Sequence, residues 1–188
     1  MRDMIKPTIT LFFICFIVAL CLALINSLTR DSIVQRTKIE SEEQRKQVMH
    51  EAKKFNEVDK WKQKDESGII REAYAAYDGE KFMGYVFSAF PKGYGGEIKV
   101  TVGIYNDRRV AGVRLGENKE TPGLGSKASE DGFINQYIGK SVQNALQVVK
   151  RSPVADNEIQ AISGATITSS AVTSAVQASA ELADKLIK

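Results

Sequence analysis

The sequence has few of the side chains that bind metals or form disulfides. Its two cysteines, Cys15 and Cys21, lie in an apolar N-terminal segment, and its one histidine, His50, lies in a highly charged stretch. The rest of the chain therefore has no means of forming a disulfide, a thiolate metal site or a cysteine-ligated iron–sulfur cluster. We expect no metal site, and any electron-carrying role would need an organic cofactor.

Charge of one sign is not in excess either. The 188 residues include 26 Lys and Arg against 23 Asp and Glu, which gives a formal net charge of +3. No strongly basic face suggests binding to nucleic acid. The length is sufficient for one globular domain with an appendage.

Residues 8–28 carry no charge and consist mainly of Leu, Ile, Phe, Val and Ala. As a helix they would be about 31 Å long, which matches the hydrocarbon core of a bilayer. A cleaved signal peptide is the alternative, but the run is long for one and no clear small-x-small cleavage site follows. We predict a single-pass membrane anchor over residues 1–29.

The flanking charges do not decide its orientation. Arg2 and Lys6 precede the span, whereas several basic residues follow it closely: Arg30, Arg36, Lys38, Arg45 and Lys46. This count alone places the larger part of the chain inside the cell, but the positive-inside rule is weak for long translocated domains. Residues 30–66 are highly charged, with Val48, Ala52 and Phe55 on one helical face, and predict an exposed juxtamembrane helix.

From Gly68 the pattern changes to strands. Residues 69–77 are apolar and aromatic, Asp78-Gly79 is a hairpin signal, and residues 81–90 continue as a strand. In residues 98–105, apolar side chains alternate with other side chains, which predicts a strand. Residues 110–115 are another predicted strand, after a turn at Asn106-Asp107. We predict a meander of about four antiparallel strands in a domain over residues 67–188.

The C-terminal part predicts helices that pack on this sheet. Ser129 is a candidate cap of a short helix through Tyr137, and residues 146–149 are a candidate short strand. A helical stripe then indicates core packing: Val172, Ala175, Val176, Ser179, Leu182, Ala183 and Leu186. The predicted fold class is α+β, with a single transmembrane helix ahead of an antiparallel sheet packed by helices.

Three small-residue segments are candidates for a ligand site. Two are glycine-rich loops, residues 92–96 and 120–127, of which the second has a threonine and a lysine and can wrap a planar or phosphorylated ligand. The third, Ser163–Ser170, is rich in hydroxyl residues and precedes the long helix, where free N–H groups suit a phosphate. The alternatives are ordinary turns for the loops and a Ser/Thr-rich helix cap for the third segment.

Two motifs together resemble a known family. Glu120-Thr121-Pro122-Gly123-Leu124-Gly125 and Ser163-Gly164-Ala165-Thr166 are similar to those of the FMN-binding domain of membrane redox pumps. That family includes the G subunits of Rnf complexes and the C subunits of sodium-pumping NADH:quinone reductase. The single N-terminal anchor, the short length and the Gly93-Tyr94-Gly95-Gly96 segment favour the Rnf G subunits, and the resemblance covers nearly the whole chain.

The resemblance implies that FMN is attached covalently. In the family, its phosphate is esterified to the last threonine of an Asp-x-x-(Ser/Thr)-Gly-Ala-(Thr/Ser) motif, by a flavin transferase that uses FAD. The match places the ester on Thr166, with Ser163, Gly164 and Ala165 in their motif positions and Gln160 in place of the aspartate. The expected further contacts of FMN are Thr168, Glu120, Thr121, Gly123, Leu124, Gly125, Lys127 and Tyr94.

The implied function is that of an electron-transfer subunit in the cell membrane, with its C-terminal domain extracytoplasmic. Its partners would be the other membrane subunits of a complex that couples ferredoxin:NAD⁺ oxidoreduction to Na⁺ or H⁺ translocation. We expect no catalytic residue and no turnover by the isolated chain. The alternatives are a flavinylated extracytoplasmic carrier or reductase outside an Rnf complex, and a membrane-anchored binding module without cofactor.

Overall fold

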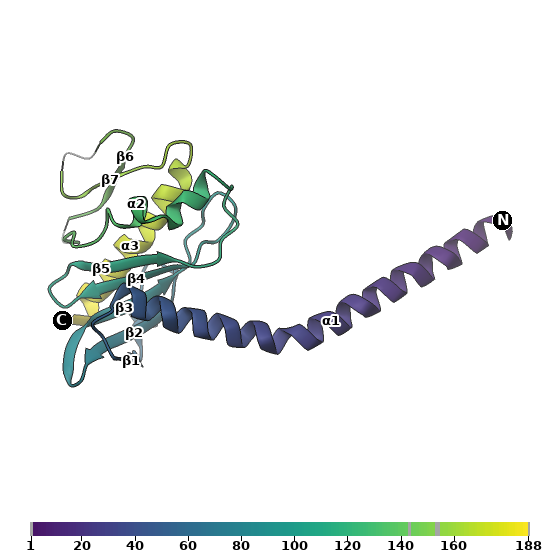
Figure 1. The fold of residues 1–188 in the computed structure, drawn as a ribbon, viewed down its shortest axis with the longest axis horizontal. Helices are drawn as coiled ribbons and strands as arrows, with labels where there is room; N and C mark the ends of the chain where they lie inside the picture. The colour runs from purple at the N-terminus through teal and green to yellow at the C-terminus, as the bar shows by residue number, and fades with distance from the viewer. Residues whose placement is uncertain (1, 143, 153–154, 188) are drawn as a thin grey trace. The chain divides into compact units, whose positions relative to one another are not determined.

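The computed structural model describes residues 2–142, 144–152 and 155–187 (Figure 1). The chain divides into two compact units, residues 1–42 and residues 43–188. Its first elements are α1 (Arg2–Val48), β1 (Lys54–Glu57), a 3₁₀ turn η1 (Trp61–Gln63), β2 (Ile70–Asp78), β3 (Lys81–Ala89), β4 (Val100–Tyr105) and β5 (Val110–Leu115). They are followed by a 3₁₀ turn η2 (Gly125–Ser129), α2 (Asp131–Ile134), β6 (Gln147–Val149), β7 (Glu158–Gln160) and α3 (Thr166–Ile187).

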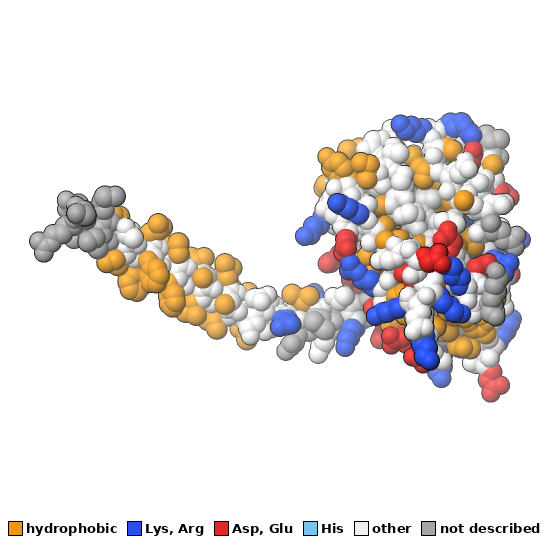
Figure 2. Space-filling view, turned by 180° about the vertical axis from the view of Figure 1, so that it is seen from behind, with side chains coloured by type: hydrophobic (Ala, Val, Ile, Leu, Met, Phe, Trp, Pro, Cys, Tyr) orange, Lys and Arg blue, Asp and Glu red, His pale blue; other side chains and the backbone are white. Residues whose placement is uncertain are grey.

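Helix α1 contains a long apolar stretch near its N-terminal end. Pro7–Arg30, a stretch of 24 residues, is long and apolar enough to cross a membrane, and none of it is buried within the protein. Figure 2 shows apolar side chains along the visible face of this helix, whereas the visible face of the globular unit carries charges of both signs. An exposed apolar helix of this length is not stable in water, because nothing within the protein covers its side chains.

The expected helix over residues 30–66 is only partly correct. Helix α1 ends at Val48, and Lys54–Glu57 form a strand that pairs antiparallel with β2, with Lys54 opposite Tyr77. Only Phe55 of β1 is partly buried, because the strand lies at the edge of the sheet. A mostly exposed edge strand needs no regular apolar alternation, so its sequence resembles that of a charged exposed segment.

The globular unit is built on a five-stranded antiparallel sheet in the order β1-β2-β3-β4-β5. Every strand pairs with its neighbour in sequence, so the predicted meander is confirmed, with β1 as an additional strand. The β2–β3 hairpin turns at Gly79, whose φ of +62° suits glycine. Because β4 is antiparallel to both β3 and β5, these two strands end at the same edge of the sheet, where both glycine-rich loops begin.

The sheet has two packed faces. One face covers a small cluster of Val48, Met49, Ala52, Ala76 and Val86. The end of α1 approaches the sheet closely there, since a Cβ atom on the paired Gly103 or Gly112 would lie 2.9 or 2.8 Å from the carbonyl oxygen of Val48. Gln44 adds a hydrogen bond, accepting from the Thr101 hydroxyl at 2.9 Å.

The other face carries the main core. Helix α3 covers it (Figure 1). In the predicted stripe of α3, Val172, Ala175 and Val176 are all fully buried. Tyr137 is fully buried as well, and its hydroxyl pairs with that of Thr173 at 2.8 Å. Burial raises the pKa of Tyr137 well above its usual range, because the phenolate would lose its hydration there. Helix α3, which packs in this core, begins at the candidate site.

The segment between β5 and α3 is less regular than expected. Helix α2 spans only Asp131–Ile134, and its N-cap residue is Glu130, so the prediction that Ser129 caps a helix through Tyr137 is wrong. The predicted short strand is confirmed as β6, which pairs in parallel with β7.

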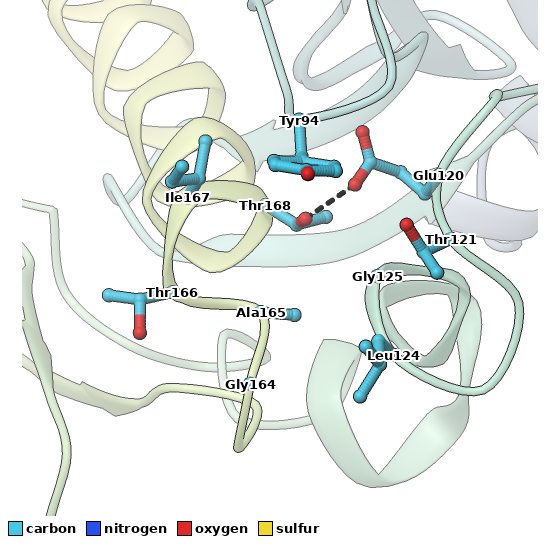
Figure 3. Close-up of a pocket in the computed structure, with 10 residues that line it drawn as sticks. All are labelled: Tyr94, Glu120, Thr121, Leu124, Gly125, Gly164, Ala165, Thr166, Ile167 and Thr168. Atoms are coloured by element: carbon cyan, nitrogen blue, oxygen red, sulfur yellow. Dashed lines mark hydrogen bonds between the residues drawn. The ribbon is translucent and has the colours of Figure 1, made fainter.

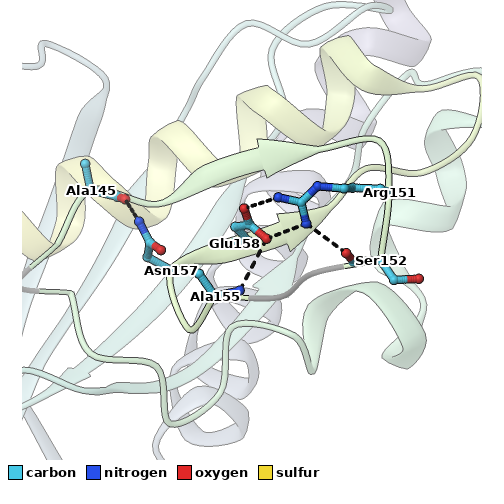
Figure 4. A network of polar contacts seen from close by, with 6 residues as sticks. All are labelled: Ala145, Arg151, Ser152, Ala155, Asn157 and Glu158. Atoms are coloured by element: carbon cyan, nitrogen blue, oxygen red, sulfur yellow. Dashed lines mark hydrogen bonds and ion pairs between the residues drawn. The ribbon is translucent and has the colours of Figure 1, made fainter.

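The loop between β6 and β7 is tied by a buried carboxylate. Figure 4 shows Glu158, 8% exposed, accepting two hydrogen bonds from the Arg151 guanidinium at 2.6 and 2.9 Å. The Ala155 N–H donates to the same carboxylate at 3.3 Å. This bidentate pair holds Arg151, which follows β6, to Glu158, the first residue of β7.

Candidate functional site

Three segments far apart in the sequence meet around one cavity of about 490 Å³. They are the loop after β3, the loop after β5 and the first turn of α3 with the turn before it (Figure 3). The residues that line the cavity are Tyr94, Glu120, Thr121, Leu124, Gly125, Gly164, Ala165, Thr166, Ile167 and Thr168. Nine of these ten are among the candidate site residues named from the sequence, so the two motifs and the first glycine-rich loop line one cavity.

A tight turn sets the entry into α3. Gly164 has a φ of +78°, a left-handed conformation that favours glycine, and the Ala165 N–H donates to the carbonyl of Ile162 at 2.9 Å. The Ser169 hydroxyl fastens this turn from within the helix, because it donates to the Ala165 carbonyl and accepts from the Ile162 N–H. The helix therefore begins at Thr166, within the hydroxyl-rich segment.

The hydroxyl groups of this segment have different environments. Thr168 is 1% exposed and donates to Glu120 at 2.5 Å, and Ser169 is fully buried. Thr166 is partly exposed and lines the cavity, and within the described residues its hydroxyl has no hydrogen-bond partner. In Figure 3 that hydroxyl points away from the Glu120–Thr168 pair. Of these three groups, only Thr166 is available for chemistry.

Glu120 joins the three segments. Its carboxylate is buried, with the residue only 6% exposed, and it accepts from the Gly95 N–H at 2.9 Å as well as from Thr168. A Cβ atom at Gly93 or Gly125 would overlap its oxygens, so these glycines leave the space that the carboxylate fills. The structure thus gives Glu120 a role in holding the site together.

The rim of the cavity is apolar and unusually exposed. Tyr94 is 71% exposed, Leu124 44% and Ile167 57%, although all three are large apolar side chains beside a cavity. Ile167 was not predicted, but it is an apolar residue in the first turn of α3 that lies outside the buried stripe. That mismatch is the sequence signal that identifies it.

A second, more open cavity adjoins the first. It has a volume of about 430 Å³ and shares Thr166 and Ile167 with the main cavity. Its other lining residues are Lys92, Ser170, Ala171 and Ser174. Thr166 therefore stands between the main cavity and a second one whose lining includes a lysine.

Three predicted residues do not line the main cavity. Ser163 and Lys127 are exposed beside it, and Gly123 uses its N–H to close the loop on the Ser126 hydroxyl at 2.9 Å. Gln160, at the motif position of aspartate, is the exposed last residue of β7. Its backbone N–H donates to the side chain of Gln136 at 2.8 Å.

Comparison with known proteins identifies the domain in which this cavity lies. Residues 93–181, which span both glycine-rich loops and Thr166, match the FMN-binding domain family. The G subunit of the Na⁺-translocating ferredoxin:NAD⁺ oxidoreductase complex of Acetobacterium woodii is 37% identical over 194 residues, covering 97% of this chain and 93% of that protein. The G subunit of the proton-translocating ferredoxin:NAD⁺ oxidoreductase complex of Clostridium ljungdahlii is 36% identical, covering 89% of this chain and 84% of that protein.

The chain belongs to the G-subunit family of these complexes. The resemblance inferred from the two motifs is thereby confirmed. The apolar helix and membership of the G-subunit family together indicate a membrane-anchored protein.

Solved structures of related proteins have the same fold. The C subunit of the Na⁺-translocating NADH:quinone reductase from Parabacteroides distasonis aligns with a TM-score of 0.53 and 24% identity, over 62% of each chain. NqrC from Shewanella oneidensis aligns with a TM-score of 0.54 and 20% identity, over 74% of this chain and 73% of that one. This member of the G-subunit family thus has the α+β fold predicted from its sequence.

The residues of the cavity fit FMN. Its volume lies within the range of about 300–1,000 Å³ that small-molecule sites occupy. The exposed Tyr94, Leu124 and Ile167 offer an apolar rim that a flat ring would cover. The first turn of α3 leaves backbone N–H groups without intrahelical partners beside Thr166, which suits a phosphate.

Proposed function

We propose that the chain is the electron-transfer subunit of an Rnf-type complex and carries FMN esterified through its phosphate to Thr166. The observation that carries this proposal is the position of the Thr166 hydroxyl. It lies at the start of α3, on the wall of the cavity that both motifs form, with no hydrogen-bond partner within the described residues. Its neighbours Thr168 and Ser169 are buried and already hydrogen-bonded.

Each part of the site would hold a different part of the cofactor. Tyr94, Leu124 and Ile167 would cover the ring and exclude water, while Gly164 and Ala165 would leave room for the ribityl chain near the backbone. The N-terminus of α3 stabilises the remaining negative charge of the phosphate ester. When bound, FMN supplies the transfer of one or two electrons, which no side chain of this chain provides.

Attachment needs a separate enzyme, because a threonine hydroxyl is a poor nucleophile at neutral pH. We propose a flavin transferase with FAD as donor. The Thr166 oxygen forms a bond to the phosphorus on the flavin side, the bond between the two phosphates breaks, AMP leaves and the hydroxyl proton is lost to solvent. A covalent link keeps the flavin on the domain without a free pool to replace it.

Within the complex, the bound FMN would exchange electrons with the cofactors of other subunits, coupled to Na⁺ or H⁺ movement. Reducing the purified complex through ferredoxin or NADH should bleach the flavin absorbance of the G-family chain. A complex with Thr166→Ala should lack that part of the signal and lose electron transfer between ferredoxin and NAD⁺. Unchanged bleaching and activity in the variant complex would contradict the proposed function.

We also propose that the globular unit lies outside the cytoplasm. Both native cysteines, Cys15 and Cys21, lie within the apolar helix, so a new cysteine on the globular unit can be labelled selectively. Asn135→Cys, at an exposed position away from the cavity, should react with a membrane-impermeant maleimide in intact cells with a permeable outer layer. The wild-type chain should stay unlabelled. Labelling of the variant only after cell lysis would contradict the proposal and place the globular unit in the cytoplasm.

A further inference from the structure

The buried carboxylate beside the cavity has a consequence for the redox chemistry of the site. Glu120 lines the cavity and is 6% exposed, and each of its two oxygens accepts one hydrogen bond. The donors are the Gly95 N–H and the Thr168 hydroxyl, both of which are neutral. Two donors directed at its two oxygens are the arrangement that suits an ionised carboxylate, which only accepts hydrogen bonds.

No cation neutralises this charge within the described residues. The ion pairs of the globular unit involve other carboxylates, and Glu120 is in none of them. The nearby lysines, Lys119 and Lys127, are exposed. A charge with little access to water and no counterion is screened less than a surface charge, so its field extends into the cavity.

We propose that the Glu120 carboxylate lowers the reduction potential of the flavin held in this cavity. Two-electron reduction of a flavin near neutral pH takes up two electrons and one proton and leaves one negative charge on the ring. A negative carboxylate at the cavity wall opposes that added charge and disfavours the reduced form. Glu120 is therefore a positioning residue with a second, electrostatic role, and a low potential suits exchange of electrons with strong reductants.

The test is a redox titration of the full-length, covalently flavinylated chain with dithionite and mediators, followed by flavin absorbance. Glu120→Gln keeps the shape of the side chain and can still hydrogen-bond to Gly95 and Thr168. It should raise the ratio of reduced to oxidised flavin at a fixed potential at least tenfold, which is about 30 mV for a two-electron couple. Glu117→Gln, which removes an exposed charge three residues earlier on the same loop, should shift that ratio less than about threefold.

Thr168→Val separates the electrostatic role from a structural one. It removes the hydrogen bond between α3 and Glu120 and keeps the carboxylate. Because one donor that offsets the negative charge is lost, the reduction potential of the flavin should stay the same or fall. A rise in both Glu120→Gln and Thr168→Val, or no rise in Glu120→Gln, would overturn the proposal. If Glu120→Gln does not fold, Thr168→Val decides alone, because a higher potential in it contradicts the charge effect.

The inference rests on the proposed function, but different experimental results would refute the proposed function and the role of Glu120. Mass spectrometry of each chain before the titration shows whether FMN is attached. A wild-type chain without attached FMN refutes the proposed function before any potential is measured. A fully flavinylated Glu120→Gln chain with an unchanged potential refutes only the role of Glu120.

Discussion

Thr166→Ala is expected to abolish covalent flavin attachment, while Thr166→Ser keeps it. The hydroxyl at this position is the only part of the side chain that forms the ester, and serine supplies the same oxygen. The partly exposed Thr166 contributes little to packing, so alanine should change the free energy of unfolding by about 0.5 kcal/mol or less. Loss of flavin with unchanged stability separates chemistry from misfolding.

Neighbouring hydroxyls are not expected to replace Thr166. Thr168 is the next threonine of the motif region, but it is 1% exposed and its hydroxyl is bonded to Glu120. Ser163 and Ser170 are exposed but do not line the main cavity. Intact mass and in-gel flavin fluorescence of chains co-expressed with the flavin transferase provide the measurement. Flavin retained on the Thr166→Ala chain after denaturation would show that the linkage is assigned to the wrong residue.

Gly95→Ala is expected to disrupt the site by pushing its two loops apart. A Cβ atom at Gly95 would overlap the carbonyl oxygen of Lys119 and lie 2.6 Å from its carbonyl carbon. Both groups belong to the backbone, so no side chain can rotate to relieve the clash. The loop must move, and the hydrogen bond from the Gly95 N–H to Glu120 is then lost. We expect a loss of about 1–3 kcal/mol in the free energy of unfolding.

The matched control is Gly132→Ala, which adds the same methyl group to α2 where no atom lies within 4 Å. Alanine is the better helix former, so this change should be neutral or slightly stabilising, within about 1 kcal/mol. The midpoint temperature of thermal unfolding and the fraction of chains that acquire flavin should both fall for Gly95→Ala. Both should stay unchanged for Gly132→Ala. Equal behaviour of the two variants would mean that the loops are not packed as described.

Much of the fold follows from local patterns in the sequence. The alternation in residues 98–105 and the Asp78-Gly79 turn predict the meander, because one buried face and a tight turn leave a clear period. The stripe through Val172 and Ala175 predicts the face of α3 that is buried. Strand β1 was missed because an edge strand with one partly buried residue has no such period.

Most residues of the candidate site could be named from sequence motifs, but their arrangement in space could not. The two motifs identify both Thr166 and Glu120 as candidate site residues but do not distinguish their roles. The fold shows that Glu120 is buried between the two loops and α3, whereas Thr166 is partly exposed and its hydroxyl has no hydrogen-bond partner in the part of the chain that the structure describes. Such differences arise from tertiary contacts between segments that are distant in the sequence, which local patterns do not encode.

Tandem mass spectrometry of the peptide that contains residues 163–170 tests the central claim most directly. The full-length chain is made with the flavin transferase, purified under denaturing conditions and digested. The proposed linkage predicts a mass increase of one FMN less one water, with the fragment ions placing it on Thr166. An unmodified peptide with the flavin lost on denaturation, or a modification on another residue, would contradict it.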